Sequence, residues 1–304
     1  MVQEKNEKTI KINNMNYLKK IFRRAYIEYL RQFDLKGYNC YMYELNTGRK
    51  VNLKNPRTLD DKIIYMSFYT DTSKWSELAD KVKVRDYIIA KGYGDILTKQ
   101  YGVYTTPDEI DFDALPADGF VIKTNNASTT NIIIRDKSNL NVCQVKNQLR
   151  KWLKWNYSKI SGDPHYAKIK PMILIEELLK DDSPFNTPSL ADFKFFCSEG
   201  RPLCVEMMTD RTRTSHRRRF YDMEWNVRDE WMMAGYPVAD VAEKPVVFDE
   251  MKAIASYLSK EFKFVRVDFY IINGKPVFGE LTFTPGATEC STELEYYLGD
   301  NIHL

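Results

Sequence analysis

The sequence predicts a mixed α+β protein, and three patterns support that prediction. Apolar residues recur at helical spacing in several long segments, while other short runs are rich in Val, Ile, Leu and Phe and are typical of strands. Two pairs of these runs are joined by tight turns, which indicates antiparallel hairpins. Strands and helices do not follow one another in a regular βαβ series, so a parallel sheet is not expected.

The expected elements cover most of the chain. Helices are predicted at residues 14–33, 58–69, 77–91, 139–155 and 247–262. Strands are predicted at residues 120–123, 131–134, 172–178, 192–197, 203–207, 265–272 and 276–281, and a short strand with loops at 92–112. The last two strands are joined by Asn273-Gly274-Lys275, in which Asn-Gly is a strong signal for a two-residue hairpin turn.

Composition limits the class of protein. The 304 residues are 43% hydrophobic, which suffices for one or two domains with a sizeable core. The formal net charge of +3 gives no global bias toward nucleic acid or membrane. The N-terminus has no apolar signal region, and no stretch approaches the roughly 20 apolar residues of a membrane span.

The cysteines and histidines suggest no metal or redox centre. The five cysteines are scattered without a C-x-x-C pair, which favours a reducing, cytoplasmic location. Cys197 and Cys204 lie in apolar strand-like runs and are expected in the core. The histidines His165, His216 and His303 are isolated, and each is expected at the surface.

The predicted helix at residues 14–33 is basic and amphipathic. One interpretation is a surface helix whose apolar stripe packs on the domain. The other is a helix that contacts a membrane surface or a partner protein. Peripheral membrane contact is therefore possible in principle, whereas an integral segment is not expected.

The C-terminal hairpin carries the strongest chemical signal. Because side chains alternate along a strand, Val265, Val267 and Phe269 point to one face and Arg266, Asp268 and Tyr270 to the other. The alternating residues expected on one face of the partner strand are Phe278, Glu280 and Thr282. If the polar faces coincide, two carboxylates without His or Cys form an oxygen-ligand set suited to Mg²⁺. The alternative is an exposed hairpin face with a cross-strand ion pair.

The same hairpin resembles a known superfamily. Arg266-x-Asp268, followed by Glu280-x-Thr282-x-x-Pro285-Gly286, is similar to the metal-binding end of ATP-grasp ligases. The run FVRVDFYIINGKPVFGELT, at residues 264–282, looks most like the TupA-like ATP-grasp family, which is associated with teichuronopeptide and cell-surface polysaccharide biosynthesis. The resemblance extends from about residue 50 to the end of the chain.

The resemblance implies an ATP-grasp fold, in which two α+β subdomains clasp ATP between antiparallel sheets. It implies an N-terminal helical extension at residues 1–50, followed by a region at 51–119 that precedes the ATP-grasp domain. The ATP-grasp domain would span 120–304, with a small lid subdomain at about 120–175 and a C-terminal subdomain at about 176–304.

The resemblance also implies roles for the hairpin residues. Asp268 and Glu280 would hold Mg²⁺ with ATP, and Arg266 would neutralise the oxygen on which charge develops. Thr282 stands where the superfamily usually has Asn. Its hydroxyl is a third possible metal ligand, and whether one or two ions bind is left open.

Two lysines are implied as phosphate ligands. Lys81 follows Asp80 in a pattern that supplies a phosphate-binding lysine in the superfamily, although a solvated helix lysine is the alternative. Lys123 ends an apolar strand, where a cation needs a partner such as a phosphate unless it extends outward to solvent. The next loop, residues 124–130, stands at the position of a Gly-rich phosphate lid but has no glycine. Ser128 and Thr129 are its candidate phosphate ligands.

The remaining nucleotide contacts follow from the same resemblance. Residues 173–179 resemble the hinge strand that contacts adenine, with Glu176, Glu177 and Leu179 as candidates. Asp192 falls where the family places an acid for the ribose hydroxyls. Lys194 is on the same strand face and is expected to reach the terminal phosphate, whereas a simple ion pair between the two is the alternative.

One dense basic run, at residues 210–219, lies outside these motifs. Arg211, Arg213 and Arg217 are candidates for recognising an acidic substrate, and a solvated loop is the alternative. Nucleic-acid binding is not favoured because no aromatic stacking platform lies nearby.

Together these features indicate an ATP- and Mg²⁺-dependent carboxylate–amine ligase that forms an amide through an acyl phosphate. By analogy, the carboxylate belongs to a uronic acid or amino acid of a capsular or cell-wall polysaccharide precursor, and an amine is the acceptor. Catalysis would rest on Arg266 and Lys194 without a nucleophilic side chain. The alternatives are an ATP-grasp-like kinase acting on a sugar hydroxyl, or a glycosyltransferase or non-catalytic module of polysaccharide assembly. The oligomeric state is not predicted.

Overall fold

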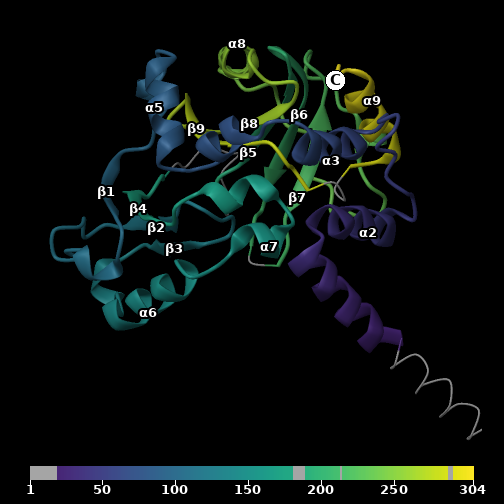
Figure 1. The fold of residues 1–304 in the computed structure, drawn as a ribbon. Helices are drawn as coiled ribbons and strands as arrows, with labels where there is room; N and C mark the ends of the chain where they lie inside the picture. The colour runs from purple at the N-terminus through teal and green to yellow at the C-terminus, as the bar shows by residue number, and fades with distance from the viewer. Residues whose placement is uncertain (1–18, 181–188, 213, 287–289) are drawn as a thin grey trace, which may run out of the picture.

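A computed structural model describes residues 19–180, 189–212, 214–286 and 290–304. Two antiparallel sheets form its centre, and helices cover their outer faces (Figure 1). The α+β prediction is therefore confirmed. The part of the predicted first helix at 14–18, and Arg213 in the basic run, lie outside the described residues.

The first sheet has four strands in the order β1-β4-β2-β3. They are β1 (Gln100–Tyr104), β2 (Phe120–Thr124), β3 (Asn131–Ile134) and β4 (Ile173–Glu177). One face packs on α6 (Val142–Trp152), and Phe120, Ile122 and Ile175 on that face share a small apolar core with Val145 and Leu149 of α6. The other face carries Lys123 and Glu176 together with the apolar side chains of Val121, Ile133 and Leu174.

The second sheet has five strands in the order β7-β6-β5-β8-β9. They are β5 (Asp192–Ser198), β6 (Arg201–Thr209), β7 (Arg217–Tyr221), β8 (Val265–Ile272) and β9 (Lys275–Thr282). Helix α8 (Phe248–Ser259) covers one face, and Phe248 packs against Phe195 of β5. On this face Val265, Val267 and Phe269 are buried in the larger core, as predicted.

The other helices lie around the second sheet and below it (Figure 1). They comprise residues 19–33, α2 (Leu35–Thr47), α3 (Leu59–Tyr69), α4 (Ser73–Leu78), α5 (Lys83–Ala90), α7 (Tyr157–Ser161) and α9 (Thr292–Asp300). Short 3₁₀ turns are η1 (Gly94–Ile96), η2 (Pro107–Glu109), η3 (Lys137–Asn139), η4 (Pro164–Lys168) and η5 (Asp229–Trp231). Apolar residues of α3, α4, α5 and α9 join the core of the second sheet.

The packing divides the chain differently from the predicted boundary between residues 119 and 120. Helices α3 to α5, which precede that boundary, belong to the core of the second sheet. Strand β1 also precedes it, yet pairs with β4 in the first sheet. Residues 51–119 therefore contribute to both sheets. Strand β1 pairs with β4, and helices α3 to α5 pack in the core of the second sheet, so both sets of partners lie far along the chain.

The single helix predicted at residues 77–91 is wrong. Helix α4 ends at Leu78 and α5 begins at Lys83. The buried carboxylate of Asp80 accepts hydrogen bonds from the backbone N–H groups of Val82 and Lys83, and this local turn competes with helix continuation. Lys81 is thereby placed in a turn, so its interpretation as a solvated helix lysine is also wrong.

The predicted alternation on β9 fails at one position. Asp268 pairs with Glu280, but Phe269 pairs with Phe278, so Gly279 is an extra residue that forms a β-bulge. Phe278 therefore turns into the apolar core instead of sharing the face of Glu280. A side chain at Gly279 would bring its Cβ to 3.0 Å from the carbonyl oxygen of Asp268, which explains the glycine there.

The turn between β8 and β9 forms as predicted. Ile272 pairs with Lys275, and Asn273 and Gly274 between them have φ of 50° and 70°. Positive φ at both central residues is the signature of the two-residue turn that Asn-Gly favours. The turn residues therefore fix the register of the β8–β9 hairpin, and with it the positions of the polar residues.

Candidate functional site

The register of the second sheet gathers the predicted polar residues on one face. Asp268 of β8 lies between Lys194 of β5 and Glu280 of β9, and Arg266 lies opposite Thr282. The predicted convergence of the two polar faces is confirmed. The alternative of an exposed hairpin face is wrong, because Asp268 is only 2% exposed.

Two cations hold Asp268 ionised. Arg266 donates from Nε to Oδ1 and from Nη2 to Oδ2, both at 2.7 Å, and Lys194 Nζ donates to Oδ2 at 2.8 Å. Burial alone raises the pKa of Asp268, but the charges of Arg266 and Lys194 outweigh burial and hold the pKa below its ordinary value. Arg266 in turn keeps its proton, since Asp268 overcomes the effect of burial and raises the pKa of the guanidinium.

Glu280 has a more open environment. Its side chain is 43% exposed, and its Oε1 accepts a hydrogen bond from Thr282 Oγ1 at 2.9 Å and lies 3.6 Å from Arg266 Nη2. Within the described residues, no three His, Cys, Asp or Glu side chains gather as a metal site. The face thus offers two carboxylates and one hydroxyl, a hard oxygen set that suits Mg²⁺ only if phosphates and water complete the shell.

The polar face of the first sheet carries a separate ion-pair network. Lys123 and Glu176 lie on adjacent strands β2 and β4, and Lys123 Nζ donates to Glu176 Oε2 at 2.7 Å. Arg85 Nη1 donates to the other oxygen, Oε1, at 3.1 Å. The carboxylate of Glu176, which was expected to contact adenine, is therefore engaged by Arg85 and Lys123. The sequence pattern gave no role to Arg85, although it stands four residues after Lys81.

Lys81 connects the two polar faces. Its Nζ donates to the carbonyl oxygen of Ala127 in the lid loop at 2.7 Å. Burial lowers the pKa of Lys81, and the charges that act on it most are those of Glu280, Lys123 and Glu176. Lys81 thus lies where the residues of the first sheet face the carboxylates of the second.

Side-chain hydrogen bonds anchor the glycine-free lid loop, residues 124–130. Asn125 donates to Asp80 Oδ1 at 2.8 Å and accepts from the backbone N–H of Met172 at 2.7 Å. Ser128 and Tyr157 of α7 share a hydrogen bond between their hydroxyls. Thr129 has a φ of 59°, in the left-handed region that glycine usually supplies. These hydrogen bonds connect the loop to Asp80, Met172 and Tyr157.

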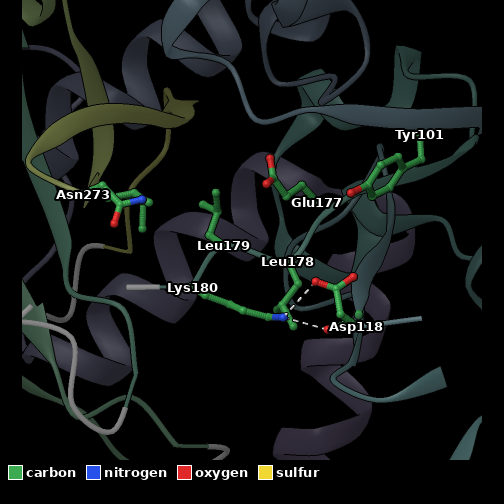
Figure 2. A pocket seen from close by; sticks show the side chains of 9 residues that line it. Tyr101, Asp118, Glu177, Leu178, Leu179, Lys180 and Asn273 are labelled. Atoms are coloured by element: carbon green, nitrogen blue, oxygen red, sulfur yellow. Dashed lines mark hydrogen bonds and ion pairs between the residues drawn. The ribbon is translucent and has the colours of Figure 1, made fainter. Parts of the chain in front are cut away.

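A small cavity of about 170 Å³ lies at the end of β4 (Figure 2). Glu177, Leu178, Leu179 and Lys180 line one side, and Asn273 of the β8–β9 turn lies across from them. Drug-sized ligands usually occupy ~300–1,000 Å³, so this volume suits only part of a nucleotide. The cavity contains the predicted hinge residues Glu177 and Leu179, whereas Glu176 points to the opposite face of β4.

Asp192 is a buried acid at the start of β5. Its Oδ1 lies 3.9 Å from Lys194 Nζ, and its Oδ2 lies 3.0 Å from Arg211 Nη2. Among the described residues, Oδ2 accepts no hydrogen bond of acceptable geometry. The charge of Asp192, followed by burial, raises the pKa of Tyr270. Oδ2 thus has an ion-pair partner in Arg211 but no aligned hydrogen-bond donor, and a ligand hydroxyl could supply one.

The basic run is partly a strand and not a loop. Residues 217–221 form β7, in which Arg217 and Arg218 point to opposite faces. Arg217 forms an ion pair with Asp240 at 3.1 Å, away from the polar face. Arg218 is completely buried on the site side and lies 3.3 Å from Glu206. Of the two predicted substrate residues that the structure describes, Arg211 lies beside the polar cluster and Arg217 does not.

Sequence reasoning missed Glu206 and Arg218. Glu206 pairs with Lys194 across β5 and β6, so it extends the polar face of the second sheet. The signal was present, because Glu206 is the one acid within the apolar run Leu203 to Met208. A lone carboxylate in a buried strand requires a charged partner.

Several solved structures are similar to this chain. The chain resembles D-alanine–D-alanine ligase from Bacillus anthracis complexed with ATP, with 17% identity, a TM-score of 0.47, and coverage of 74% of this chain and 65% of that one. It also resembles the ATP-grasp ligase PsnB complexed with a minimal precursor (9%, TM-score 0.41, 74% and 60%). A third match is phosphoribosylamine–glycine ligase from Thermotoga maritima (14%, TM-score 0.39, 71% and 52%). The chain thus spans less than two thirds of the length of each of these proteins.

The sequence places the chain in the ATP-grasp class. The model of the TupA-like ATP-grasp family matches residues 61–303, so the chain belongs to that family. No match was found among curated proteins.

Proposed function

We propose that the protein is an ATP-dependent carboxylate–amine ligase that forms an amide through an acyl phosphate. The observation that supports the proposal most directly is the arrangement of Asp268, Glu280 and Arg266 on one face, with Lys194 beside them and Lys81 across from them. Two carboxylates adjoining several cations are suited to binding a polyphosphate and its counter-ion. No part of this arrangement requires a nucleophilic side chain.

The nucleotide would lie along the polar face between the two sheets. Adenine would occupy the cavity beside Leu179 and Glu177, and a ribose hydroxyl would donate to the unsatisfied oxygen of Asp192. Lys123 and Lys81 would bind phosphate oxygens. Glu176 is then a positioning residue, because its ion pair at 2.7 Å holds the Lys123 amine above the sheet.

Asp268 and Glu280 are the residues that would hold Mg²⁺, with the Thr282 hydroxyl as a further ligand. Asp268 Oδ1 accepts one hydrogen bond, from Arg266, and a carboxylate oxygen offers about two lone-pair positions. Glu280 is exposed enough to reach a ligand. When bound, Mg²⁺ neutralises charge on the phosphate oxygens.

The reaction would then proceed in two displacements. A carboxylate oxygen of the substrate attacks the γ-phosphorus of ATP, the bond to the β-phosphate oxygen breaks, and ADP leaves. An amine nitrogen attacks the carbonyl carbon of the acyl phosphate, the carbon–oxygen bond to phosphate breaks, and the amine loses a proton. Lys194 would offset charge on the transferring group and Arg266 would stabilise the oxyanion.

The substrate class is proposed by analogy alone, from the polysaccharide biosynthesis that the sequence resemblance implies. We propose a uronic acid or amino acid of a capsular or wall precursor as the carboxylate, in the cytoplasm where ATP is available. Arg211 would contact that carboxylate, since it is half-exposed at the edge of the cluster. Arg213 and Arg217 were further candidates, but Arg217 is paired with Asp240 on the far face of β7.

ADP release should be measured with a panel of uronic acids and amino acids, each supplied with an amine. The wild-type protein should release ADP with at least one pair, and hydroxylamine should trap a hydroxamate of the carboxylate substrate. Glu280→Gln should abolish turnover with the fold intact, while Glu250→Gln on the exposed side of α8 should leave turnover unchanged.

Two outcomes would contradict the proposal. Unchanged turnover in Glu280→Gln would remove the assigned role of this carboxylate. ADP release that depends on a sugar hydroxyl and gives no hydroxamate would instead identify a kinase, the second reaction that the same phosphate-binding residues can support.

A further inference from the structure

The helix at residues 19–33 projects from the body of the protein (Figure 1, dark purple). Its aromatic residues recur at the spacing of one helical face, at Phe22, Tyr26, Tyr29 and Phe33. Phe22 is 69% exposed and Phe33 is 77% exposed. Leu30 beside this stripe is buried, and Tyr26 contacts Tyr41 of α2 with their ring centroids 5.2 Å apart, so the stripe touches the body along one edge. The expected packing of an apolar stripe on the domain is therefore met only in part, and most of the stripe is exposed.

The helix is also strongly basic. Residues 19–33 contain five basic residues and one acidic residue, which gives a net charge of +4. Arg31 forms an ion pair with Glu28 and stacks on Tyr38. Within the described part of the chain, no ion pair involves the other four basic residues, Lys19, Lys20, Arg23 and Arg24. This uncompensated charge lies beside exposed aromatic rings.

A second segment lies next to the helix, on the side of Glu28, Arg31 and Gln32. The turn between α6 and α7 presents exposed Trp155 and Lys154, and α7 presents exposed Ile160. These residues line one hollow together with Gln32 and Arg31 of the helix. Lys159 Nζ donates to Gln32 Oε1 at 2.6 Å, which fixes the α6–α7 corner against the helix. Tryptophan, tyrosine and lysine are the residues that favour a membrane–water interface.

We propose that helix 19–33 and the α6–α7 corner form a docking surface for an anionic lipid bilayer. Aromatic rings on one face and flanking basic residues are the composition of helices that lie in the interfacial plane of a membrane. Binding at this surface is peripheral, because no helix among the described residues is long and apolar enough to cross a bilayer. The inference does not depend on the ligase assignment.

The charge of the helix argues against a second copy of this chain as the occupant. Pairing two such helices along their aromatic stripes would bring two +4 segments together, and like charges at that separation repel. Anionic headgroups instead attract each basic residue near the surface. The aromatic rings add apolar contact that an acidic soluble ligand would not satisfy.

The test is co-sedimentation of the full-length protein with vesicles. Vesicles with equal parts of phosphatidylcholine and phosphatidylglycerol should bind the protein, and vesicles of phosphatidylcholine alone should not. Molar salt should release it, because the attraction is screened. Phe22→Ser with Phe33→Ser should lower the partition coefficient roughly ten-fold. Lys20→Glu with Arg24→Glu should abolish binding to the anionic vesicles.

Matched controls keep the result interpretable. Val246→Ser with Tyr296→Ser removes two exposed side chains elsewhere and should leave vesicle binding unchanged. ATP turnover in solution should be the same in all of these variants, so loss of docking is separable from failure of the ligase proposal. Equal binding of the Phe22/Phe33 variant, no binding of folded wild type to anionic vesicles, or an aromatic-dependent dimer without vesicle binding would overturn the proposal.

Discussion

Asp268 and Glu280 are direct cross-strand partners, yet their environments differ sharply. Asp268 is 2% exposed and neutralised by Arg266 and Lys194, whereas the Glu280 side chain is 43% exposed. The difference arises because Asp268 lies on a central strand between β5 and β9, while Glu280 lies on the edge strand. Asp268 therefore contributes to the stability of the fold, and Glu280 does not.

The first prediction separates these two roles. Asp268→Asn leaves two cations buried without a carboxylate, and should lower the free energy of unfolding by roughly 3–5 kcal/mol. Glu280→Gln removes a half-exposed charge and should lower it by less than about 1 kcal/mol. Urea denaturation of both variants measures the contrast. Equal losses in the two variants would show that Asp268 is not held by the pairs described.

The second prediction concerns the bulge at Gly279. Gly279→Ala places a Cβ 3.0 Å from the Asp268 carbonyl oxygen, so the bulge must shift, and Glu280 with it. We expect a loss of roughly 1–3 kcal/mol in unfolding free energy and a clear fall in ATP turnover. The control is Gly274→Ala in the adjoining turn, where φ is +70° but the space is open. It should cost about 1 kcal/mol and spare turnover, so similar turnover in the two variants would argue against a positioning role for the bulge.

The third prediction addresses the Arg85–Glu176–Lys123 network. Glu176→Gln should release the Lys123 amine and raise the KM for ATP several-fold, with a smaller effect on kcat, because the lysine is no longer held in place. Lys123→Met should raise KM further, and the double variant should be no worse than Lys123→Met alone. Steady-state kinetics of the three variants measure the coupling between Glu176 and Lys123 in ATP binding. Additive effects would mean that Glu176 acts independently of Lys123.

The fourth prediction is a pair of opposed pH dependences near the site. Burial raises the pKa of Asp163 to about 6 from its ordinary 3.8, so the unfolded chain releases this proton first and stability falls as pH rises through that window. Burial lowers the pKa of His165 to about 4 from 6.5, so the folded chain releases its proton first and stability rises over a similar window. The two contributions, roughly 2–3 kcal/mol each, should nearly cancel in the wild type.

Single variants should reveal how Asp163 and His165 each make stability depend on pH. Asp163→Asn should make the protein more stable as pH rises from about 4 to 6.5, because only the histidine contribution is left. His165→Phe should show the opposite slope, and its bulk suits the packing against Trp75 and Phe283. Urea midpoints across that pH range provide the measurement. Parallel pH profiles for wild type and both variants would contradict these assignments.

Local sequence determined much of this protein. The hairpin of β8 and β9 was predictable because Asn-Gly fixes the turn and the period of two fixes which side chains share a face, so Arg266, Asp268, Glu280 and Thr282 converge as expected. The burial of Cys197 and Cys204 followed from their apolar runs in the same way. These features depend on residues that are neighbours in the chain.

Only the tertiary structure decided the rest, because it depends on contacts between distant segments. The bulge that turns Phe278 inward, the partner Arg85 that engages Glu176, and the burial of Arg218 while Arg217 faces away all follow from pairing that no local pattern encodes. His165 was expected at the surface but is enclosed by Trp75 and Phe283, which come from segments about 90 and 118 residues away. Strand period and turn chemistry act over a few residues, whereas the choice of a charged partner is made by the packing of the whole chain.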